Sequence, residues 1–342
     1  MSRYWETMNV NSINKLENLL EEKSSTQILG DFLNDQLRNW PLATGNYKGL
    51  EKVEEKEFQF DGYKIKVQFN PERIRSSAAK VDQKSIENRA CFLCLDKLPK
   101  EQGGIAQGDD FVILVNPFPI IPQHFTIPKI DHVDQSFEEN VSGMLSLAKN
   151  MQGYTLFYNG PKCGASAPDH MHFQAGNKDF MPVETEYAVL KNLQSELLSD
   201  SNQFEMRAFP NYLRKMISIE SENEKEMMKA VSVFYQTFSG MQPEEKEPML
   251  NAICSFSDGK YSMHLFPRKL HRPSQYFAEG DQQLLISPAS VDFGGVFITP
   301  RREDFEKITS EDIVDIFKQV SVDDEFFGTF CEKLSAKLGI SL

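Results

Sequence analysis

The stretch over residues 158–176, YNGPKCGASAPDHMHFQAG, constrains the chain more than any other. It starts at the end of an apolar strand expected over 154–158 and crosses a loop rich in Gly, Ala and Ser. In an alternating strand, His170, His172 and Gln174 would present their side chains on one face. The small residues before them let backbone N–H groups approach an anion closely. This pattern is typical of a site in which a histidine attacks phosphorus.

The composition of the chain limits the classes of binding partner that we expect for it. The 342 residues include 37 Lys and Arg and 50 Asp and Glu, a formal net charge of −13. So acidic a chain is a poor candidate for binding nucleic acid or an anionic membrane surface. We see neither an apolar leader nor a membrane-length apolar run, and five cysteines are too few for a disulfide scaffold. A cytoplasmic protein is the expectation, with its oligomeric state open.

Residues 1–50 predict a helical collar that packs against the rest of the chain. Leucines at helical spacing mark two amphipathic helices before Pro41. Further on, apolar alternation around an Asp-Gly pair predicts a β-hairpin over 58–67. Arg73 and Arg75 follow this hairpin. They either bind phosphates or belong to a solvent-exposed edge.

Cys91 and Cys94 form a Cys-x-x-Cys pair, which points to metal or redox chemistry. A thioredoxin-like site needs a strand before the pair and a helix after it. Here Leu98-Pro99 and a Gly-Gly turn follow closely, so a zinc-knuckle loop fits better. Two thiolates need two more ligands to complete a tetrahedral site. The alternatives are a thiol-redox pair and two free cysteines in a turn.

The strands and helices occur in a similar order twice. In the first half, strands expected over 110–115 and 124–128 precede a helix that Asp134 can cap, and then the strand at 154–158. In the second half, a strand expected over 212–219 precedes an amphipathic helix and a hairpin around another Asp-Gly pair. Such a repeat indicates duplicated architecture.

Antiparallel strands with interleaved helices predict an α+β fold of two similar halves, each an antiparallel sheet with packed helices. A helix over about 182–198 and a polar boundary at 199–202 separate them. We therefore expect a catalytic half over 51–199 and a second half over 200–342 that ends in C-terminal helices. The segment 285–300 falls where the histidine motif falls in the first half, but it contains no histidine.

The run HMHFQ at 170–174 resembles the His-φ-His-φ-Gln signature of the transferase branch of the histidine-triad superfamily. This branch includes galactose-1-phosphate uridylyltransferase, diadenosine tetraphosphate phosphorylase and GDP-L-galactose phosphorylase. Upstream, the run from Asn116 through His124 to His132 is similar to the branch's Asn-x-x-Pro…Gly-His…His segment, with Gln123 in place of the glycine. The whole chain most resembles a bacterial branch of this group.

The resemblance implies that His172, the second histidine, is the nucleophile. A neutral imidazole whose other nitrogen is held by a backbone carbonyl can attack the α-phosphorus and form a nucleotidyl-histidine. Gln174 would hydrogen-bond the phosphoryl oxygens, with His170 completing the catalytic motif. Hydrolytic histidine-triad proteins have a third histidine in the place of Gln174. Because glutamine cannot shuttle a proton, capture by phosphate or a sugar phosphate is favoured over capture by water.

Several residues are candidates to bind the substrate. Those of the first half offer an amide, an ammonium, a hydroxyl or a backbone N–H near the histidines, namely Asn116, Asn159, Lys162, Gly164, Ala165 and Ser166. In the second half, Arg268 and Arg272 belong to the densest basic cluster outside the motif. These arginines either reach the phosphates of the leaving group or balance an acidic surface.

The resemblance also supplies a full set of metal ligands. In uridylyltransferases similar to this chain, a Cys-x-x-Cys pair, a loop histidine and the first histidine of the signature bind structural zinc. The matching residues are Cys91, Cys94, His132 and His170, a Cys₂His₂ set. The implied cofactor is Zn²⁺.

The sequence therefore predicts a nucleotidyltransferase or phosphorylase that acts on a nucleoside diphosphate sugar or a dinucleoside polyphosphate. Its partners would be the nucleotide and a phosphate or sugar-phosphate acceptor. The alternatives are a nucleotide hydrolase of the same fold and a non-catalytic nucleotide sensor that uses the same pocket. Fold resemblance alone does not determine the substrate.

Overall fold

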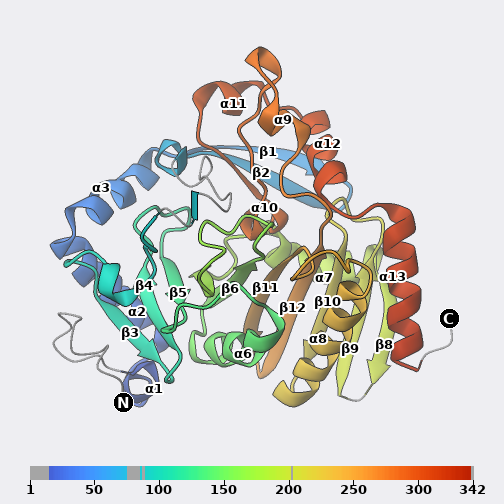
Figure 1. Cartoon of the computed structure of the whole chain (residues 1–342), viewed down its shortest axis with the longest axis horizontal. Helices are drawn as coiled ribbons and strands as arrows, with labels where there is room; N and C mark the ends of the chain where they lie inside the picture. The colour runs from blue at the N-terminus through green and yellow to red at the C-terminus, as the bar shows by residue number, and fades with distance from the viewer. Residues whose placement is uncertain (1–14, 75–84, 87–88, 202, 340–342) are drawn as a thin grey trace.

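The structure is a computed structural model that describes residues 15–74, 85–86, 89–201 and 203–339 (Figure 1). Its centre is a ten-stranded antiparallel sheet in the order β3-β4-β5-β7-β6-β11-β12-β10-β9-β8. The first half contributes β3 (Gly104–Gln107), β4 (Phe111–Val115), β5 (His124–Pro128), β6 (Tyr154–Asn159) and β7 (His172–Asn177). The second contributes β8 (Glu196–Ser201), β9 (Phe204–Phe209), β10 (Met216–Ser221), β11 (Leu250–Ser257) and β12 (Lys260–Pro267).

The two halves repeat one order of elements. In each half three strands precede a helix, which is α6 (Val141–Asn150) or α8 (Glu224–Ser239), and two more strands follow it. The α+β fold of two halves is therefore confirmed. The halves share one sheet, because β6 pairs with β11 in a register that places Asn159 opposite Asn251.

Helices cover one face of this sheet. They are α1 (Leu16–Leu19), α2 (Ser25–Asn39), α3 (Pro41–Gly49), α6, α8 and α13 (Asp324–Lys337). A capping box between Ser24 and Gln27 starts α2, and buried leucines on its inner face join the core beneath the sheet. Helix α2 ends at Asn39, before Trp40 and Pro41 as predicted. Pro41 then starts α3, since a proline at the first helical position has no N–H to lose.

A second, smaller sheet lies over the other face (Figure 1). It consists of β1 (Glu54–Phe60), β2 (Tyr63–Phe69) and β13 (Val296–Thr299), and β13 pairs with β2 in parallel. Around it are α7 (Pro182–Leu193), α9 (Ser274–Phe277), α10 (Ser290–Phe293), α11 (Arg302–Lys307) and α12 (Ser310–Val320). The short 3₁₀ turns are η2 (Leu50–Lys52), η3 (Pro71–Arg73), η4 (Leu95–Lys97), η5 (Glu138–Asn140) and η6 (Gly280–Gln282). This layer has its own core, which includes Phe157, Phe297 and Phe317.

Several predicted boundaries are wrong. The helix expected to reach residue 198 ends at Leu193, and residues 199–201 of the polar stretch belong to β8. This edge strand is exposed at both ends, so its sequence lacks the alternation of a half-buried strand. The strand expected from residue 212 begins at Met216, after a turn in which Arg214 is buried against aromatic rings.

The second half contains no counterpart of the histidine loop at 285–300. That segment forms α10 and β13 and joins the smaller sheet. In the order of elements, β12 corresponds to β7, and an Asp258-Gly259 turn stands where the first half has its long loop. None of the described helices is both long and apolar enough to cross a membrane.

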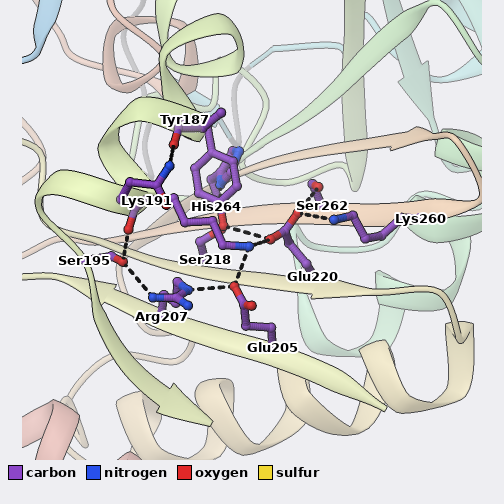
Figure 2. Close-up of polar contacts among 12 residues, drawn as sticks. Tyr187, Lys191, Ser195, Glu205, Arg207, Ser218, Glu220, Lys260, Ser262 and His264 are labelled. Atoms are coloured by element: carbon purple, nitrogen blue, oxygen red, sulfur yellow. Dashed lines mark hydrogen bonds and ion pairs between the residues drawn. The ribbon is translucent and has the colours of Figure 1, made fainter. Parts of the chain in front are cut away.

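Helix α7 is tied to the second half of the sheet by a charged network (Figure 2). The Glu220 carboxylate accepts hydrogen bonds from Lys191 Nζ of α7 at 2.5 Å and from Lys260 Nζ of β12 at 2.8 Å. Tyr187 Oη also lies 3.3 Å from Glu220, and Ser218 links Tyr187 to His264 of β12. The same lysine of α7 pairs with Glu205 of β9 at 2.6 Å. These contacts join α7 to three neighbouring strands.

We expect the Glu220→Gln substitution to lower the free energy of unfolding by an amount that depends on pH. Burial raises the pKa of Glu220, but hydrogen bonds from Lys191 and Lys260 outweigh it and lower the pKa to about 2. The ionised Glu220 therefore contributes its full share to the free energy of unfolding above the usual pKa of 4.5, and this share is lost as the pH falls toward 2. The variant should lose about 2–3 kcal/mol of unfolding free energy at pH 7, and less at pH 3.

Denaturant titrations at the two pH values measure this difference. Glu332→Gln, at an exposed position of α13, serves as the control. An equal loss of stability at both pH values for Glu220→Gln would contradict the role given to this network.

Candidate active site

A cavity of about 520 Å³ is lined by both halves of the chain. It brings together most of the residues expected to bind substrate, namely Asn116, Asn159, Gly164, Ala165, Ser166, His172, Gln174 and Arg272. Its wall also contains apolar residues of the collar and of the segment that carries and follows the thiols, such as Trp40, Leu42, Phe92, Leu98 and Pro99. The cavity wall therefore combines polar and apolar residues.

His172 stands at the start of β7 with its tautomer determined by the backbone. Its Nδ1 lies 2.8 Å from the carbonyl oxygen of His170, and a carbonyl can only accept, so Nδ1 donates the proton. The other ring nitrogen, Nε2, then has a free lone pair. Burial lowers the pKa of His172 to about 4, although the bond to His170 opposes this shift. The ring is thus arranged as a neutral nucleophile.

Gln135 separates the two strands at the site. The last ladder pair between β6 and β7 is Phe157 with Gln174. Beyond it, Gln135 Nε2 donates to the carbonyls of Asn159 at 2.9 Å and His172 at 3.0 Å, and its Oε1 accepts from the N–H of His172 at 2.8 Å. The side-chain amide replaces the missing ladder bonds. Sequence reasoning missed this residue, because nothing in its loop signals the role.

Gln174 is oriented by a buried histidine. The backbone N–H of Ile120 donates to His124 Nδ1 at 3.2 Å, so Nε2 of the ring carries the proton. This Nε2 lies 2.9 Å from Gln174 Oε1 and donates to it. Burial lowers the pKa of His124 to about 3, which keeps the ring neutral. With its oxygen engaged, Gln174 has its NH₂ group left to donate to a ligand in the cavity.

Asn159 is oriented in the same way, but from the second half. Its Oδ1 accepts from the backbone N–H of Ser290 at 2.8 Å and from Asn251 Nδ2 at 2.9 Å. Asn251 is fully buried, and its NH₂ also donates to the carbonyl of Cys163 in the loop. The remaining NH₂ group of Asn159 is therefore a donor available at the cavity wall.

The small-residue loop is pressed against the second half. Gly164 has φ +97°, and a Cβ atom there would lie 2.5 Å from Ala289 Cβ. Both the backbone conformation and the contact exclude larger residues. The loop is thus held where its N–H groups can reach an anion, with Ala165 and Ser166 on the cavity wall.

Two predicted substrate-binding residues lie outside the wall. Lys162 is mostly exposed and forms an ion pair with Glu245 at 2.7 Å. Arg268 is fully buried and donates to Asn251 Oδ1 and to the carbonyls of Pro288, Leu270 and His271. Arg268 therefore supports the cavity from behind.

Arg272 lies on the wall as expected. Its Nε donates to Ser287 Oγ at 3.0 Å, and its guanidinium lies 4.2 Å from the ring centroid of Tyr276. Arg73 also lines the cavity, whereas Arg75 falls outside the described residues.

The wall also contains polar residues that were not predicted to bind substrate. Among them are Arg89, His271, Ser287 and Asp292. The Asp292 carboxylate accepts from the N–H groups of Ala289 at 2.8 Å and Ile298 at 3.3 Å, and burial raises its pKa to about 7. These residues come from loops and short turns, where the sequence shows no periodicity.

The four expected metal ligands meet beside the cavity. One donor atom from each of Cys91, Cys94, His132 and His170 lies within 4.8 Å of the others. His170 Nε2 donates to the carbonyl of Lys129 at 2.8 Å, which leaves Nδ1 free, 3.3 Å from Cys91 Sγ. This second-shell bond and the two thiols fit a tetrahedral metal site.

His170 faces these thiols and is absent from the cavity wall, so its side chain does not share a face with His172 and Gln174 as expected. It precedes β7, where strand alternation does not yet hold. The short turn η4 follows Cys94 in place of the long helix of a thioredoxin-like site.

The fold that carries this site is also found in solved structures of known proteins. Solved structures of the yeast Ap4A phosphorylase Apa2 share this fold. The free enzyme has 16% identity and a TM-score of 0.50, with 82% of this chain and 93% of that chain covered. The complex with Ap4A has 15% identity and a TM-score of 0.51, with 83% and 97% covered. The complex with AMP has 18% identity and a TM-score of 0.50, with 84% and 97% covered.

Two domain families match consecutive parts of the chain. Residues 32–177 match a family described as a domain of unknown function (DUF4922). Residues 188–340 match one described as GDPGP1-like, C-terminal domain. None of the curated proteins compared with the chain matches it.

We expect Gly164→Ala to destabilise the protein more than a glycine change elsewhere. The variant combines backbone strain with a collision against Ala289, and should lose about 2–4 kcal/mol. Gly259→Ala is a matched control, since Gly259 has φ +78° but no heavy atom within 4 Å of the added Cβ. It should lose about 1 kcal/mol. Chemical denaturation measures both, and equal losses would contradict the close packing of the loop.

Proposed function

We propose that the protein is a nucleotidyltransferase or phosphorylase that cleaves a nucleoside diphosphate sugar or a dinucleoside polyphosphate through a nucleotidyl-histidine on His172. The observation that carries the proposal is the tautomer of His172, whose Nε2 lone pair lies in a cavity lined by amide donors. The similar yeast structures are of an Ap4A phosphorylase, with Ap4A or AMP bound, and this supports a nucleotide substrate.

In the first step, His172 Nε2 forms a bond to the α-phosphorus while the bond to the bridging oxygen breaks and the phosphorylated group leaves. The NH₂ groups of Gln174 and Asn159 are placed to bind the non-bridging oxygens, together with N–H groups of residues 164–166. The carbonyl of His170 holds the Nδ1 proton and stabilises the imidazolium that forms. In the second step, an acceptor oxygen attacks phosphorus and releases His172.

Gln174 favours a phosphate-type acceptor over water. Its only oxygen accepts from His124, so the side chain offers the site N–H donors and no general base. A phosphate dianion attacks without such help, whereas a water molecule needs a group to take its proton. The proposal therefore places hydrolysis second to phosphorolysis or transfer.

We expect a covalent nucleotide adduct when the protein is mixed with nucleotide substrates in the absence of an acceptor. Intact-protein mass spectrometry over GDP-, UDP- and ADP-sugars and Ap4A should show the added mass of one nucleoside monophosphate. His172→Ala should show none, and His264→Gln, which changes a histidine of the α7 network, should retain it.

An adduct that persists in His172→Ala would refute the nucleophile. If the parent protein binds nucleotide but forms no adduct, the alternative of a non-catalytic nucleotide sensor is favoured.

We also propose that Cys91, Cys94, His132 and His170 hold a structural Zn²⁺, which would anchor the chain just before β7. The ion would tie the thiol loop to His170, whose carbonyl orients His172. A cytoplasmic location, where thiols stay reduced, suits such a site. The division into a collar over 1–50, a catalytic half over 51–199 and a second half over 200–342 is part of the same proposal.

Metal analysis of the purified protein should find about one zinc per chain. Cys94→Ser should reduce the zinc content and lower the melting temperature, because the site contributes to folding. Cys331→Ala, at a cysteine in the core far along the chain, should keep the metal. A reversible disulfide between Cys91 and Cys94 in a metal-free protein would support the redox alternative instead.

A further inference from the structure

Strands β6 and β7 separate at the end of the sheet that carries the site. Their ladder ends at the pair of Phe157 and Gln174. Beyond that pair, β7 continues in register with β5 as far as His172, and β6 continues with β11 as far as Asn159. Each strand end therefore stays with its other neighbour, and the separation lies between Asn159 and His172.

The side chain of Gln135 lies between these two strand ends. Its Oε1 accepts from the N–H of His172 at 2.8 Å, and its Nε2 donates to the carbonyls of His172 at 3.0 Å and Asn159 at 2.9 Å. In an ordinary antiparallel ladder, the N–H of His172 would bond directly to the carbonyl of Asn159. An amide group and a second hydrogen bond between the backbones hold them farther apart than the roughly 4.8 Å of paired strands.

The loop after β5 holds Gln135 and the backbone of the nucleophile together. Gln135 is 3% exposed, and each polar atom of its side chain is hydrogen-bonded. In the same loop, the carbonyl of Val133 accepts from the N–H of Met171 at 2.7 Å, and the N–H of Lys129 donates to the carbonyl of Met171 at 2.8 Å. Residues on both sides of the peptide bond between Met171 and His172 are thus held by one loop.

The wider spacing has a cost, which indicates that it has a use. A direct ladder bond needs no side chain, whereas ordering a buried glutamine costs up to about 2 kcal/mol of rotamer freedom. Side chains of an ordinary opposed pair have Cβ atoms only about 5 Å apart. Asn159 and His172 both line the cavity, and a phosphoryl group attacked by His172 must lie about 3–3.5 Å from the attacking nitrogen. It therefore needs room between the two side chains.

We propose that Gln135 is a positioning residue that keeps the ends of β6 and β7 apart and so sets the distance between the His172 imidazole and the Asn159 amide. The α-phosphoryl group of the substrate fits between these two side chains. Gln135 is not among the residues that line the cavity in the described chain, so it acts through the backbone of its partners. This inference rests on the proposed function, because that phosphoryl group is the one His172 attacks.

The first test measures formation of the nucleotidyl adduct in Gln135→Ala. Without the amide, the N–H of His172 can bond directly to the carbonyl of Asn159, which brings the two side chains closer. At saturating nucleotide the rate of adduct formation should fall about 100-fold, as expected for a nucleophile displaced from its reactive geometry. The nucleotide concentration for half-maximal rate should change less than about tenfold, since the rest of the cavity wall is kept.

Two further variants support the comparison. Gln135→Asn keeps the amide but is one methylene shorter, so it cannot bond both strands and should lower the rate at least about tenfold. It serves if Gln135→Ala does not fold. Gln242→Ala is the matched control, because this amide also joins two chain segments, accepting from the N–H of Met249 and donating to the carbonyl of Arg268, each at 2.7 Å. It should keep the parent rate.

The second test needs no substrate. In NMR spectra of protein labelled with ¹⁵N-histidine, the Nδ1 proton of His172 should be protected by its bond to the carbonyl of His170, and the signal is identified by its absence in His172→Ala. In Gln135→Ala this proton should exchange with water at least about tenfold faster, because the backbone that holds the ring is released. Gln242→Ala should leave the signal unchanged.

The two tests separate this inference from the proposed function. If the parent forms no adduct but the Nδ1 proton responds to Gln135→Ala, the positioning role stands and the covalent mechanism fails. If the folded Gln135 variants form the adduct at the parent rate, the mechanism stands and the positioning role fails. Equal losses of rate and affinity with an unchanged Nδ1 signal would also overturn the assignment.

Discussion

The pairing of β6 with β11 is the interaction on which the site depends. It joins two five-stranded halves into one sheet and places Asn159 opposite Asn251 at the end where β6 stops. From this pair the second half reaches into the first, because Asn251 donates to Asn159 and to the carbonyl of Cys163. The second half has a short turn at Asp258-Gly259 where the first half has the long loop with the histidines, yet its Asn251 orients the Asn159 amide at the cavity wall. In the proposed mechanism, the first half supplies the nucleophile and the second half positions a substrate-binding amide.

The polar side chains of the site are each held by hydrogen bonds to part of the group. The remaining nitrogen of each side chain is left available to the cavity. The carbonyl of His170 accepts a hydrogen bond from Nδ1 of His172, and His124 Nε2 donates one to the oxygen of Gln174. In the same way, the oxygen of Asn159 accepts hydrogen bonds from Ser290 and Asn251. Each bond selects a tautomer or an amide orientation, so in the proposed mechanism the donors would need no rearrangement when charge develops on phosphorus. Such preorganisation requires a rigid surround, which the two packed cores supply.

Much of this arrangement could be predicted from the sequence. The hairpin around Asp61-Gly62 and the strand before the histidine loop follow from local patterns. The four residues of the Cys/His cluster follow from the family resemblance. The edge strand β8 could not, because its exposed ends lack alternation. The roles of Gln135 and Asn251 could not be predicted either, since they depend on strands that meet only in the folded sheet. The direction of His170 was wrong for a related reason, because the strand starts two residues later.

The arginines illustrate what sequence clustering misses. Arg268 belongs to the densest basic cluster of the second half, yet four acceptors in the protein already hold it. Arg73, which the sequence left between a phosphate ligand and a solvated edge, lines the cavity wall. Proximity along the chain therefore says little about which cation reaches the cavity. The folded structure separates the two, because Arg73 is on the wall and Arg268 is not.

The central claim is that His172 attacks through Nε2, and the most direct measurement is ³¹P NMR of the nucleotidyl-protein with mapping of the modified peptide. The bond from Nδ1 to the carbonyl of His170 leaves only the other nitrogen to react. The account therefore predicts a single phosphoramidate resonance from a nucleotide linked to Nε2 of His172. Linkage through Nδ1, or modification of any other residue, would contradict it.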